Sequence, residues 1–351
     1  MKTIKSNILE AIGQTPIVRL NKVAKNLPVE ILVKCEFMNP GGSIKDRIGR
    51  YICQKAMERG QLKAGGVIVE ATSGNTGMGI ALFAAVHDCQ AIFVMSDKQS
   101  REKIDLLKST GSIVVICPSS VDSSHPDSYH SVAHKLAKEI PGAFYADQYE
   151  NDDNYLSHYF NTGPEIWEQT EGDFDFFAAG VGTGGTISGT TKYFKEKSTR
   201  IKSLGIDPVG SILLPYSKTK KISEGSAYLV EGIGQDYLPG NVKFDLIDYF
   251  VNVNDQQSFS MTRRLLKEEG IFCGGSCGSA VAGTINFVND NPVLTQGKRF
   301  VVILPDSGAR YLSKLYNKNW LKDKGIAFGV ENDTLSLKVK EISGTTARIE
   351  I

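Results

Sequence analysis

The segment NPGGSIKDR, residues 39–47, places Lys45 directly behind a glycine–glycine–serine turn. A lysine in such a position either carries a solvated surface charge, as most lysines do, or presents an amine inside a cleft. The glycines let the backbone approach a bound molecule, but they are equally common in ordinary turns. Lys45 is therefore a candidate catalytic residue whose role depends on what the other loops provide.

The segment AAGVGTGGTISG, residues 178–189, forms a glycine-rich loop between an apolar run and a helical pattern. Gly180, Gly182 and Gly185 fit the pattern G-x-G-x-x-G. Asp207 ends the next apolar run, at about the distance where a dinucleotide site has its ribose-binding acid. One hypothesis is therefore an NAD-dependent oxidoreductase, and glycines that merely permit close helix–strand packing are a further alternative.

The hydroxyl groups of this loop favour a different ligand. Thr183 and Thr186 stand among the glycines, and the start of the following helix adds backbone N–H groups and the positive end of the helix dipole. Such a compact cup suits one dianionic group, so a single phosphate fits better than a pyrophosphate. We call residues 182–186 the phosphate loop, although the glycine pattern alone does not decide between the two ligands.

A second polar loop follows another apolar run, in the segment ATSGNTG at residues 71–77. It offers the side chains of Thr72, Ser73, Asn75 and Thr76, together with backbone N–H groups at a predicted helix start. That combination suits a carboxylate. Helix capping is the alternative, but a cap needs one such residue and this loop has four within five positions. We call residues 72–76 the carboxylate loop.

A third loop, LPDSGARY at residues 304–311, places Ser307 after a strongly apolar run. We expect Ser307 to point into the same cleft, unless Ser307 or Asp306 only caps the next helix. One lysine, a cup for a single phosphate and a cup for a carboxylate indicate pyridoxal phosphate (PLP) acting on an amino acid. The sequence contains no H-E-x-x-H, no Walker A sequence and no nucleophile elbow with a His–Asp pair.

The composition is that of a globular enzyme and disfavours several other classes. The 351 residues carry 40 Lys and Arg against 39 Asp and Glu, so no basic excess indicates nucleic-acid binding. Apolar runs are too short for a membrane span, and the N-terminus has no signal-peptide pattern, so no membrane contact is expected. Six cysteines without a second pair at zinc-site spacing indicate reduced thiols, no metal site and a cytoplasmic location.

The elements that must position these loops repeat one order: an apolar run, a Gly/Ser/Thr turn and a helical pattern. Strands rich in Val, Ile and Phe that alternate with helices predict parallel sheets covered on both faces. Two such blocks, residues 65–145 and 172–320, are separated by the polar segment DQYENDDNYLSHY and predict two α/β lobes. Ligands of such sheets bind beyond the carboxyl ends of the strands, where the glycine loops stand. The alternating segment 334–351 predicts a β-hairpin around Ser343 and Gly344.

The segments NPGGSIKDR, EATSGNTG, GVGTGGT and PDSGARY, in this order and at roughly this spacing, resemble the β-family of PLP-dependent enzymes, the cysteine synthases and cystathionine β-synthases. The resemblance extends over about residues 5–320. It implies fold type II, similar to tryptophan synthase β: two three-layer α/β/α lobes with the cofactor in the cleft between them, usually in a homodimer. It also implies a larger cofactor-binding lobe of residues 1–45 and 155–320, a smaller mobile lobe of residues 46–154, and a tail of residues 321–351.

By this resemblance, Lys45 forms the Schiff base with the cofactor and then serves as the base on the Cα proton of the substrate. Asn75 hydrogen-bonds the phenolic oxygen of the cofactor, and Ser307 contacts the pyridine nitrogen. The phosphate is held by Gly182, Thr183, Gly184, Gly185 and Thr186. The substrate carboxylate is bound by Thr72, Ser73, Asn75, Thr76 and Gln148. Because the two loops lie in different lobes, amino-acid binding is expected to draw the lobes together.

Segments such as SDKQSREKIDLLK, YLVEGIGQDYLP and CGGSCGSA resemble cystathionine β-synthases more than cysteine synthases. The resemblance implies β-replacement on serine, cysteine or O-acetylserine through an aminoacrylate intermediate. The acceptor would be a thiol such as homocysteine, and hydrogen sulfide would be released when cysteine is the donor. An O-acetylserine sulfhydrylase (cysteine synthase), or another β-substituting or eliminating relative, is the alternative. A relative without activity is disfavoured, because Lys45, Asn75 and Ser307 are all present.

The second substrate is expected to arrive beside the segment EGIGQD. An acid there would help a poor leaving group depart or would activate water. Gln235 stands where cystathionine β-synthases commonly have tyrosine, which leaves the acceptor open. The candidates for this side of the site are Tyr149, Glu231, Gly232, Gln235 and Asp236.

Overall fold

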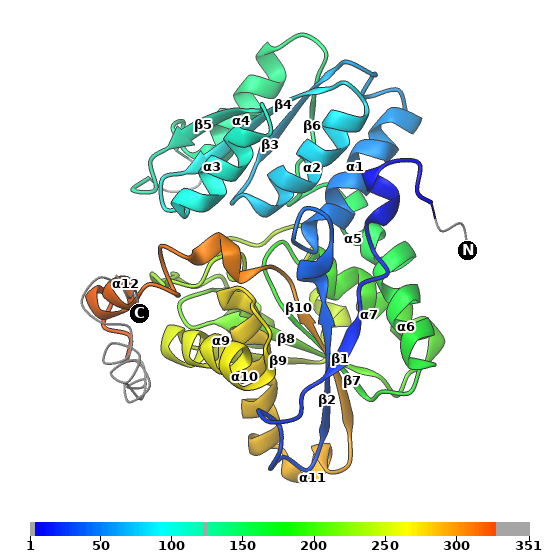
Figure 1. Cartoon of the computed structure of the whole chain (residues 1–351), viewed down its shortest axis with the longest axis vertical. Coiled ribbons are helices and arrows are strands. Elements are labelled where there is room, and N and C mark those ends of the chain that lie inside the picture. The colour runs from blue at the N-terminus through cyan, green and yellow to red at the C-terminus, as the bar shows by residue number, and fades with distance from the viewer. Residues whose placement is uncertain (1–3, 122–124, 328–351) are drawn as a thin grey trace, which may run out of the picture.

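The structure is a computed structural model and describes residues 4–121 and 125–327. Two α/β lobes are stacked, each around its own sheet (Figure 1). The larger sheet has the strand order β1 (Ile17–Arg19), β2 (Glu30–Cys35), β10 (Arg299–Leu304), β7 (Phe176–Gly180), β8 (Lys202–Pro208), β9 (Tyr249–Val253). The smaller sheet has the order β5 (Ile113–Cys117), β4 (Gln90–Ser96), β3 (Val67–Ala71), β6 (Ala143–Tyr145).

The predicted parallel pairing is confirmed for every named strand pair except one. The exception is β1, which pairs antiparallel with β2 and forms an edge of the larger sheet. Central strands are buried on both faces and therefore read as continuous apolar runs. In β10, for example, Phe300 to Leu304 are all buried. An antiparallel strand at the edge of an otherwise parallel sheet is a common variation, and the short segment 17–19 gives no sequence signal for it.

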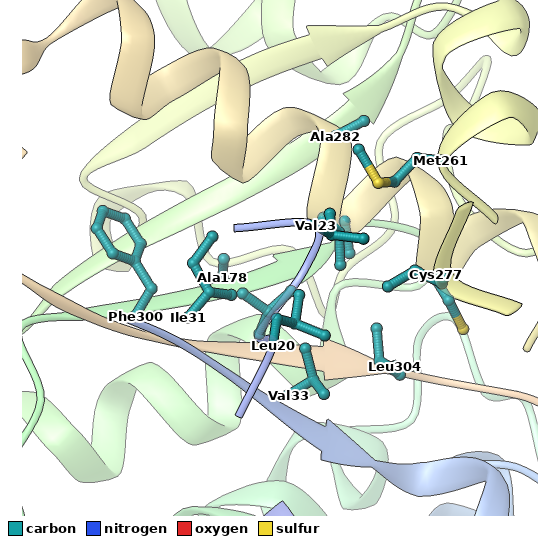
Figure 2. Packing of buried hydrophobic residues seen from close by; sticks show 14 of the residues in the cluster. Leu20, Val23, Ile31, Val33, Ala178, Met261, Cys277, Ala282, Phe300 and Leu304 are labelled. Atoms are coloured by element: carbon teal, nitrogen blue, oxygen red, sulfur yellow. The ribbon is translucent and has the colours of Figure 1, made fainter. Parts of the chain in front are cut away.

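Helices cover both faces of the larger sheet. On one face, α9 (Asp255–Glu269) and α10 (Gly275–Asp290) pack over β2, β10, β7 and β8. Figure 2 shows sheet residues such as Ile31 and Phe300 facing Met261, Cys277 and Ala282 from these helices. The other face is covered by α6 (Gly163–Thr170), α7 (Gly185–Lys197) and α8 (Leu213–Thr219).

The smaller sheet is covered in the same way, because successive side chains of a strand point to opposite faces. In β4, Phe93 packs with α1 (Lys45–Glu58), α2 (Asn75–Val86) and α3 (Arg101–Ser109), whereas Ile92 and Val94 face α4 (Tyr129–Glu139). Each lobe therefore has three layers, α/β/α. The lobe limits given above remain a prediction.

Short elements complete the chain between these layers. α5 (Asp153–Ser157) continues through a π-helical turn (His158–Thr162) into α6, and α11 (Pro292–Thr295) and α12 (Lys318–Asp323) flank the last strand. The 3-10 turns are η1 (Ile8–Ala11), η2 (Glu36–Met38), η4 (Phe244–Leu246) and η5 (Gly308–Tyr311). Within the described ranges, no helix is both long and apolar enough to span a membrane. The predicted hairpin at 334–351 lies outside the described residues.

Candidate active site

A cavity of about 810 Å³ lies between the two lobes, beyond the carboxyl ends of the strands. The smaller lobe contributes Ser73, Asn75 and Gln148, and the larger lobe contributes the phosphate loop. Lys45, at the junction of the lobes, also lines it. The three sequence features with separate chemical interpretations therefore face one space.

Lys45 is the first residue of α1 and follows directly on the glycine turn. Its backbone N–H donates to Ser43 Oγ at 3.2 Å. Burial lowers the pKa of the Lys45 amine to about 8, although the Glu70 carboxyl partly opposes this. An amine with this pKa is neutral in an appreciable fraction near pH 7 to 8, so it can act as a nucleophile and as a base.

The phosphate loop joins β7 to the N-terminus of α7. Gly184 has φ +87°, and a Cβ on Gly185 would lie 1.9 Å from Asn154 Oδ1, so both positions require glycine. The first N–H groups of a helix have no partner within the helix, and here they converge at the positive end of α7. The loop therefore has the geometry of an anion site.

Two residues that the sequence did not single out support this loop. Asn154 Nδ2 donates to Thr183 Oγ1 at 3.0 Å. His158 Nε2 lies 3.3 Å from Thr186 Oγ1. Burial, followed by the nearby charges of Lys45 and Arg47, holds the pKa of the His158 imidazole well below its usual value. The ring is therefore neutral and orients the threonine hydroxyl without adding a charge.

The carboxylate loop divides into residues that face the cavity and residues that hold its shape. Ser73 and Asn75 line the cavity. Thr72 is buried, and its Oγ1 accepts the N–H groups of Gly74 at 2.9 Å and Gly77 at 3.2 Å. Thr72 thus makes the capping contacts that were considered as the alternative for this loop.

Thr76 and Gln148 form a second, internal part of this loop. Thr76 Oγ1 donates to Gln148 Oε1 at 2.6 Å, and Gln148 Nε2 donates to the Ala71 carbonyl at 3.0 Å. Gln148 lines the cavity, whereas Thr76 is buried behind it. The Thr76 hydroxyl therefore orients the glutamine amide, and a contact of Thr76 with the substrate carboxylate stays a prediction.

The serine predicted to meet the pyridine nitrogen requires a correction. Ser307 is not among the residues that line the cavity, and its Oγ accepts the Ala309 N–H at 3.3 Å as the N-cap of η5. Ser276, in the first turn of α10, does line the cavity. After β10 ends at Leu304, Pro305 still lines the cavity, whereas Ser307 forms a β-bridge with Cys273. The motif CGGSC contained the signal for Ser276, a serine after a glycine pair at a helix start.

Aromatic rings form the outer part of the cavity. The ring of Tyr149 packs against those of His130 at 5.0 Å and Tyr237 at 5.8 Å. Gln235 and the exposed Asp236 follow one another on the cavity wall, which Tyr149 also lines. Tyr149, Gly232, Gln235 and Asp236 all line the cavity, and their role on the acceptor side stays a prediction.

Glu231 also lines the cavity, but its environment does not suit an acid. Lys103 Nζ lies 2.6 Å from one carboxylate oxygen and Lys314 Nζ 2.6 Å from the other. Although burial opposes it, the two ammonium groups hold the pKa of the Glu231 carboxyl below its usual value. Glu231 is therefore an ionised, fully paired carboxylate.

Asp207, the candidate ribose-binding acid, is not at the cavity. It is fully buried, and its Oδ2 accepts the Leu214 N–H at 2.8 Å at the start of α8. Burial raises the pKa of this carboxyl to about 6. Asp207 anchors a helix, so the dinucleotide interpretation of the G-x-G-x-x-G pattern is wrong.

These features define a two-lobed α/β enzyme with an amine, an anion loop and a carboxylate loop in one cavity. A family model described as "Pyridoxal-phosphate dependent enzyme" matches residues 8–306, and the chain belongs to this family. Its cofactor is PLP. The nicotinamide alternative is thereby excluded.

The similar proteins carry more specific names. The cystathionine β-synthase of Apis mellifera is 44% identical over 92% of this chain and 63% of its own length. The Saccharomyces cerevisiae protein of the same name is 40% identical over 92% and 65%. Cysteine synthase 1 of Neurospora crassa is 39% identical over 92% and 86%. The chain thus spans less than two thirds of the cystathionine β-synthases named here.

A crystal structure of an O-acetylserine-dependent cystathionine β-synthase from Helicobacter pylori superposes with a TM-score of 0.80. It is 34% identical and covers 89% of this chain and 98% of that one. The predicted fold, two lobes of PLP fold type II, is confirmed.

The residues of the cavity fit PLP. Lys45 is a buried amine of lowered pKa, and the phosphate loop offers N–H groups and threonine hydroxyls. Asn75 Oδ1 is buried and has no hydrogen-bond partner within the described residues, as expected for an atom that serves a ligand. Lys45 would hold the aldehyde, the phosphate loop the phosphate, Asn75 the phenolic oxygen and Ser276 the ring nitrogen.

Proposed function

We propose that the protein catalyses β-replacement on an amino acid, with serine, O-acetylserine or cysteine as donor and a thiol as acceptor. The observation that carries the proposal is the common cavity, in which Lys45, the phosphate loop and the carboxylate loop face one another. Bound PLP supplies an electron sink for the charge that develops at Cα. The remaining steps depend on residues of this chain.

Lys45 Nζ moves the Cα proton. With a pKa of about 8, the amine accepts a proton at neutral pH and returns it later in the cycle. Backbone N–H groups at the start of α2, with Ser73 and the Gln148 amide, bind the substrate carboxylate. This fixes the orientation of Cα relative to the lysine.

Ser276 would give the ring nitrogen of bound PLP a neutral hydroxyl partner. A carboxylate at that position would keep the nitrogen protonated and strengthen the electron sink, which a hydroxyl does not do. Charge then does not persist at Cα, and this favours prompt loss of the β-substituent over slower reactions of the same carbanion.

The thiol acceptor enters along Tyr149, Gln235 and Asp236. The neighbouring His130 adds no positive charge there, because burial lowers the pKa of its imidazole to about 4. Homocysteine is the proposed acceptor, as in a cystathionine β-synthase, and sulfide is the second candidate. The names of the similar proteins, which include both cystathionine β-synthases and a cysteine synthase, support this pair of alternatives.

The first experiment tests the cofactor and the lysine. Purified protein is expected to be yellow, with an absorbance band that borohydride abolishes and that Lys45→Ala lacks. A colourless protein that PLP cannot reconstitute would contradict the proposal. Lys55→Ala, at a partly exposed position near the end of the same helix, serves as the matched control and is expected to keep the band.

The second experiment identifies the substrates. Serine, O-acetylserine and cysteine are each mixed with homocysteine or sulfide, and cystathionine, cysteine and hydrogen sulfide are measured. Cystathionine as the main product supports the first assignment, and cysteine from O-acetylserine and sulfide supports the second. We also propose that the protein is a cytoplasmic homodimer. Light scattering on the purified protein measures its mass in solution and thereby tests the dimer.

A further inference from the structure

A buried group of charges joins the two lobes beside the cavity. Glu231 Oε2 accepts from Lys103 Nζ at 2.6 Å, and Glu231 Oε1 accepts from Lys314 Nζ at 2.6 Å. The side chains of Lys103 and Glu231 are 0% and 4% exposed. A charge this deeply buried persists only when it is paired, so the two residues depend on each other.

The pair crosses from one lobe to the other. Lys103 lies in α3 of the smaller lobe, whereas Glu231 lies in the segment between α8 and β9 of the larger lobe. In sequence they are 128 residues apart. Opening of the lobes on this side therefore has to break the pair and return both charges to water.

Two further contacts flank the ion pair along the boundary between the lobes, which we call the seam. The first is uncharged and the second is exposed to solvent. Ser100 Oγ donates to the Arg310 carbonyl at 2.8 Å. Glu102 accepts from the Ser313 N–H at 2.6 Å and from its hydroxyl at 2.7 Å. The start of α3 thus lies against η5 and the turn that follows it.

Two routes lead from this seam to the carboxylate loop. The first passes through Gln99, whose amide, oriented to satisfy its neighbours, donates to Glu231 Oε2 at 3.1 Å and to the Ser73 carbonyl at 3.2 Å. The carboxylate loop is therefore tied to Glu231 through a single side chain.

The second route reaches Asn75. The Lys103 ammonium lies 4.6 Å from the centre of the Tyr311 ring, in a cation–π contact. Tyr311 OH donates to Asp306 Oδ2 at 2.6 Å, and Asn75 Nδ2 donates to the same oxygen at 2.8 Å. Asn75 is thus held from behind by residues of the larger lobe.

We propose that Glu231 is a positioning residue rather than an acid of the acceptor side. With Lys103 and Lys314 it forms an inter-lobe latch, which holds the smaller lobe closed and fixes Ser73 and Asn75 through the two routes. The proposal rests on the proposed function only in the role given to Asn75 and the carboxylate loop. The latch itself is a property of the protein without substrate.

A buried ion pair suits a contact that must form and release. Its net contribution to stability is small, because desolvation offsets most of the attraction. Removal of one partner is costly, because the other charge then stays buried without compensation. Such a pair fixes the register of two surfaces more than it stabilises either lobe.

The test measures hydrogen exchange across the seam in PLP-loaded protein without added substrate. Peptides that cover residues 98–109 and 305–316 report on its two sides. In Glu231→Gln and in Lys103→Met, their exchange is expected to accelerate by at least about tenfold. Glu231→Gln leaves the buried Lys103 charge unpaired, and Lys103→Met removes the part of the pairing that crosses between the lobes, with Glu231 still paired to Lys314. Lys108→Met, at the exposed end of the same helix, is the matched control and is expected to change nothing.

The double variant Glu231→Gln/Lys103→Met removes both charges. It is expected to exchange more slowly than the sum of the single effects predicts, because the two residues are coupled. Lys103→Arg, which keeps the charge, is expected to restore slow exchange in part. These two variants keep the test decisive if a single substitution impairs folding.

Steady-state kinetics separate positioning from catalysis. Loss of the latch is expected to raise KM for the donor amino acid about tenfold or more with a smaller change in kcat, and to leave the pH profile of kcat in place.

Small-angle scattering is expected to show a larger radius of gyration in Glu231→Gln than in the wild type. Binding of an unreactive amino acid is expected to reverse this increase. If hydrogen exchange is unchanged while kcat collapses and its pH profile loses one limb, then Glu231 acts as an acid and the proposed latch is wrong. An inactive wild type would instead contradict the proposed function, while the exchange data would still decide on the latch.

Discussion

Lys45 owes its chemistry to where its amine lies. The side chain begins α1 at the junction of the lobes, and burial lowers its pKa from 10.5 to about 8. Glu70, buried in β3, restrains this shift, and burial raises the pKa of the Glu70 carboxyl well above its usual value. The Glu70 carboxyl therefore binds a proton more readily than an ordinary glutamate, and only its charged form restrains the shift of Lys45.

The lowered pKa predicts how the protein takes up its cofactor. Only a neutral amine attacks an aldehyde, so the rate of PLP uptake by cofactor-free protein should rise about tenfold per pH unit and level off above about pH 8. Stopped-flow absorbance at a fixed PLP concentration measures this profile. A rate that still climbs in proportion near pH 10 would mean an ordinary solvated lysine, with its pKa at 10.5.

Two serines offer a sharper comparison, because one lines the cavity and the other caps a turn. Ser276→Ala should lower kcat/KM about tenfold to a hundredfold, as expected for loss of a hydrogen bond to the cofactor, with little change in unfolding. Ser307→Ala should leave kcat/KM within about twofold and lower the free energy of unfolding by about 1 kcal/mol. The reversed pattern would restore Ser307 to the site.

At the scale of elements, each binding loop depends on the strand and helix that it joins. The phosphate loop follows β7 and runs into the first turn of α7, and the tight approach of Asn154 from α5 fixes its path. Because that approach leaves no space for a side chain at Gly185, the loop has one shape. Its N–H groups are then directed before any ligand arrives.

Gly185→Ala tests this account. The added Cβ would lie 1.9 Å from Asn154 Oδ1, so the loop or α5 has to move. PLP affinity should fall by about 5- to 150-fold, which corresponds to the usual cost of overpacking, about 1–3 kcal/mol. Titration followed by absorbance measures it. Lys197→Ala, at the exposed end of the same helix, is the control, and equal losses in both variants would refute a local effect.

The sequence predicted the elements well where local rules decide them. Apolar strands followed by Gly/Ser/Thr turns indicated the two loops that meet Lys45, because parallel strands end at the same edge of a sheet. Prediction from the sequence failed where a residue's contact partner is distant in the chain. Lys103 reads as one more charge on an amphipathic helix, and nothing near it indicates that Glu231, 128 residues away, is its counterion. Ser276 was missed because several serines follow glycines, and only packing decides which one faces the cavity.

At the scale of the whole molecule, a second buried ion network holds the place where the chain passes between the lobes. Arg47 of α1 bonds Glu36 Oε2 at 2.7 Å and Glu165 Oε2 of α6 at 2.8 Å. Lys34 of β2 bonds the other oxygen of Glu165. The network thus fixes α1, which carries Lys45, against both a strand and a helix of the larger lobe.

This network predicts how stability depends on pH. Although burial opposes it, the hydrogen bonds and charge of Arg47 lower the pKa of Glu165 to about 2, and the pKa of Glu36 is lowered in the same way. Both carboxyls therefore bind protons more weakly in the folded than in the unfolded state. The stability that they contribute is present above about pH 4.5 and is lost as the pH falls towards about 2.

Urea unfolding between about pH 3 and 7 measures this loss, with the free energy of unfolding expected to fall steeply below about pH 4.5. Glu165→Gln should cost about 3–5 kcal/mol at neutral pH, because it leaves Lys34 and part of Arg47 unpaired. It should also flatten the acid limb in part, since one of the two carboxyls that titrate is gone. Glu168→Gln, at an exposed position three residues further along α6, is the control and should keep the wild-type curve. An unchanged acid limb in Glu165→Gln would place the loss of stability elsewhere. A loss of PLP affinity in that variant at neutral pH would show that the network also orients Lys45 through α1.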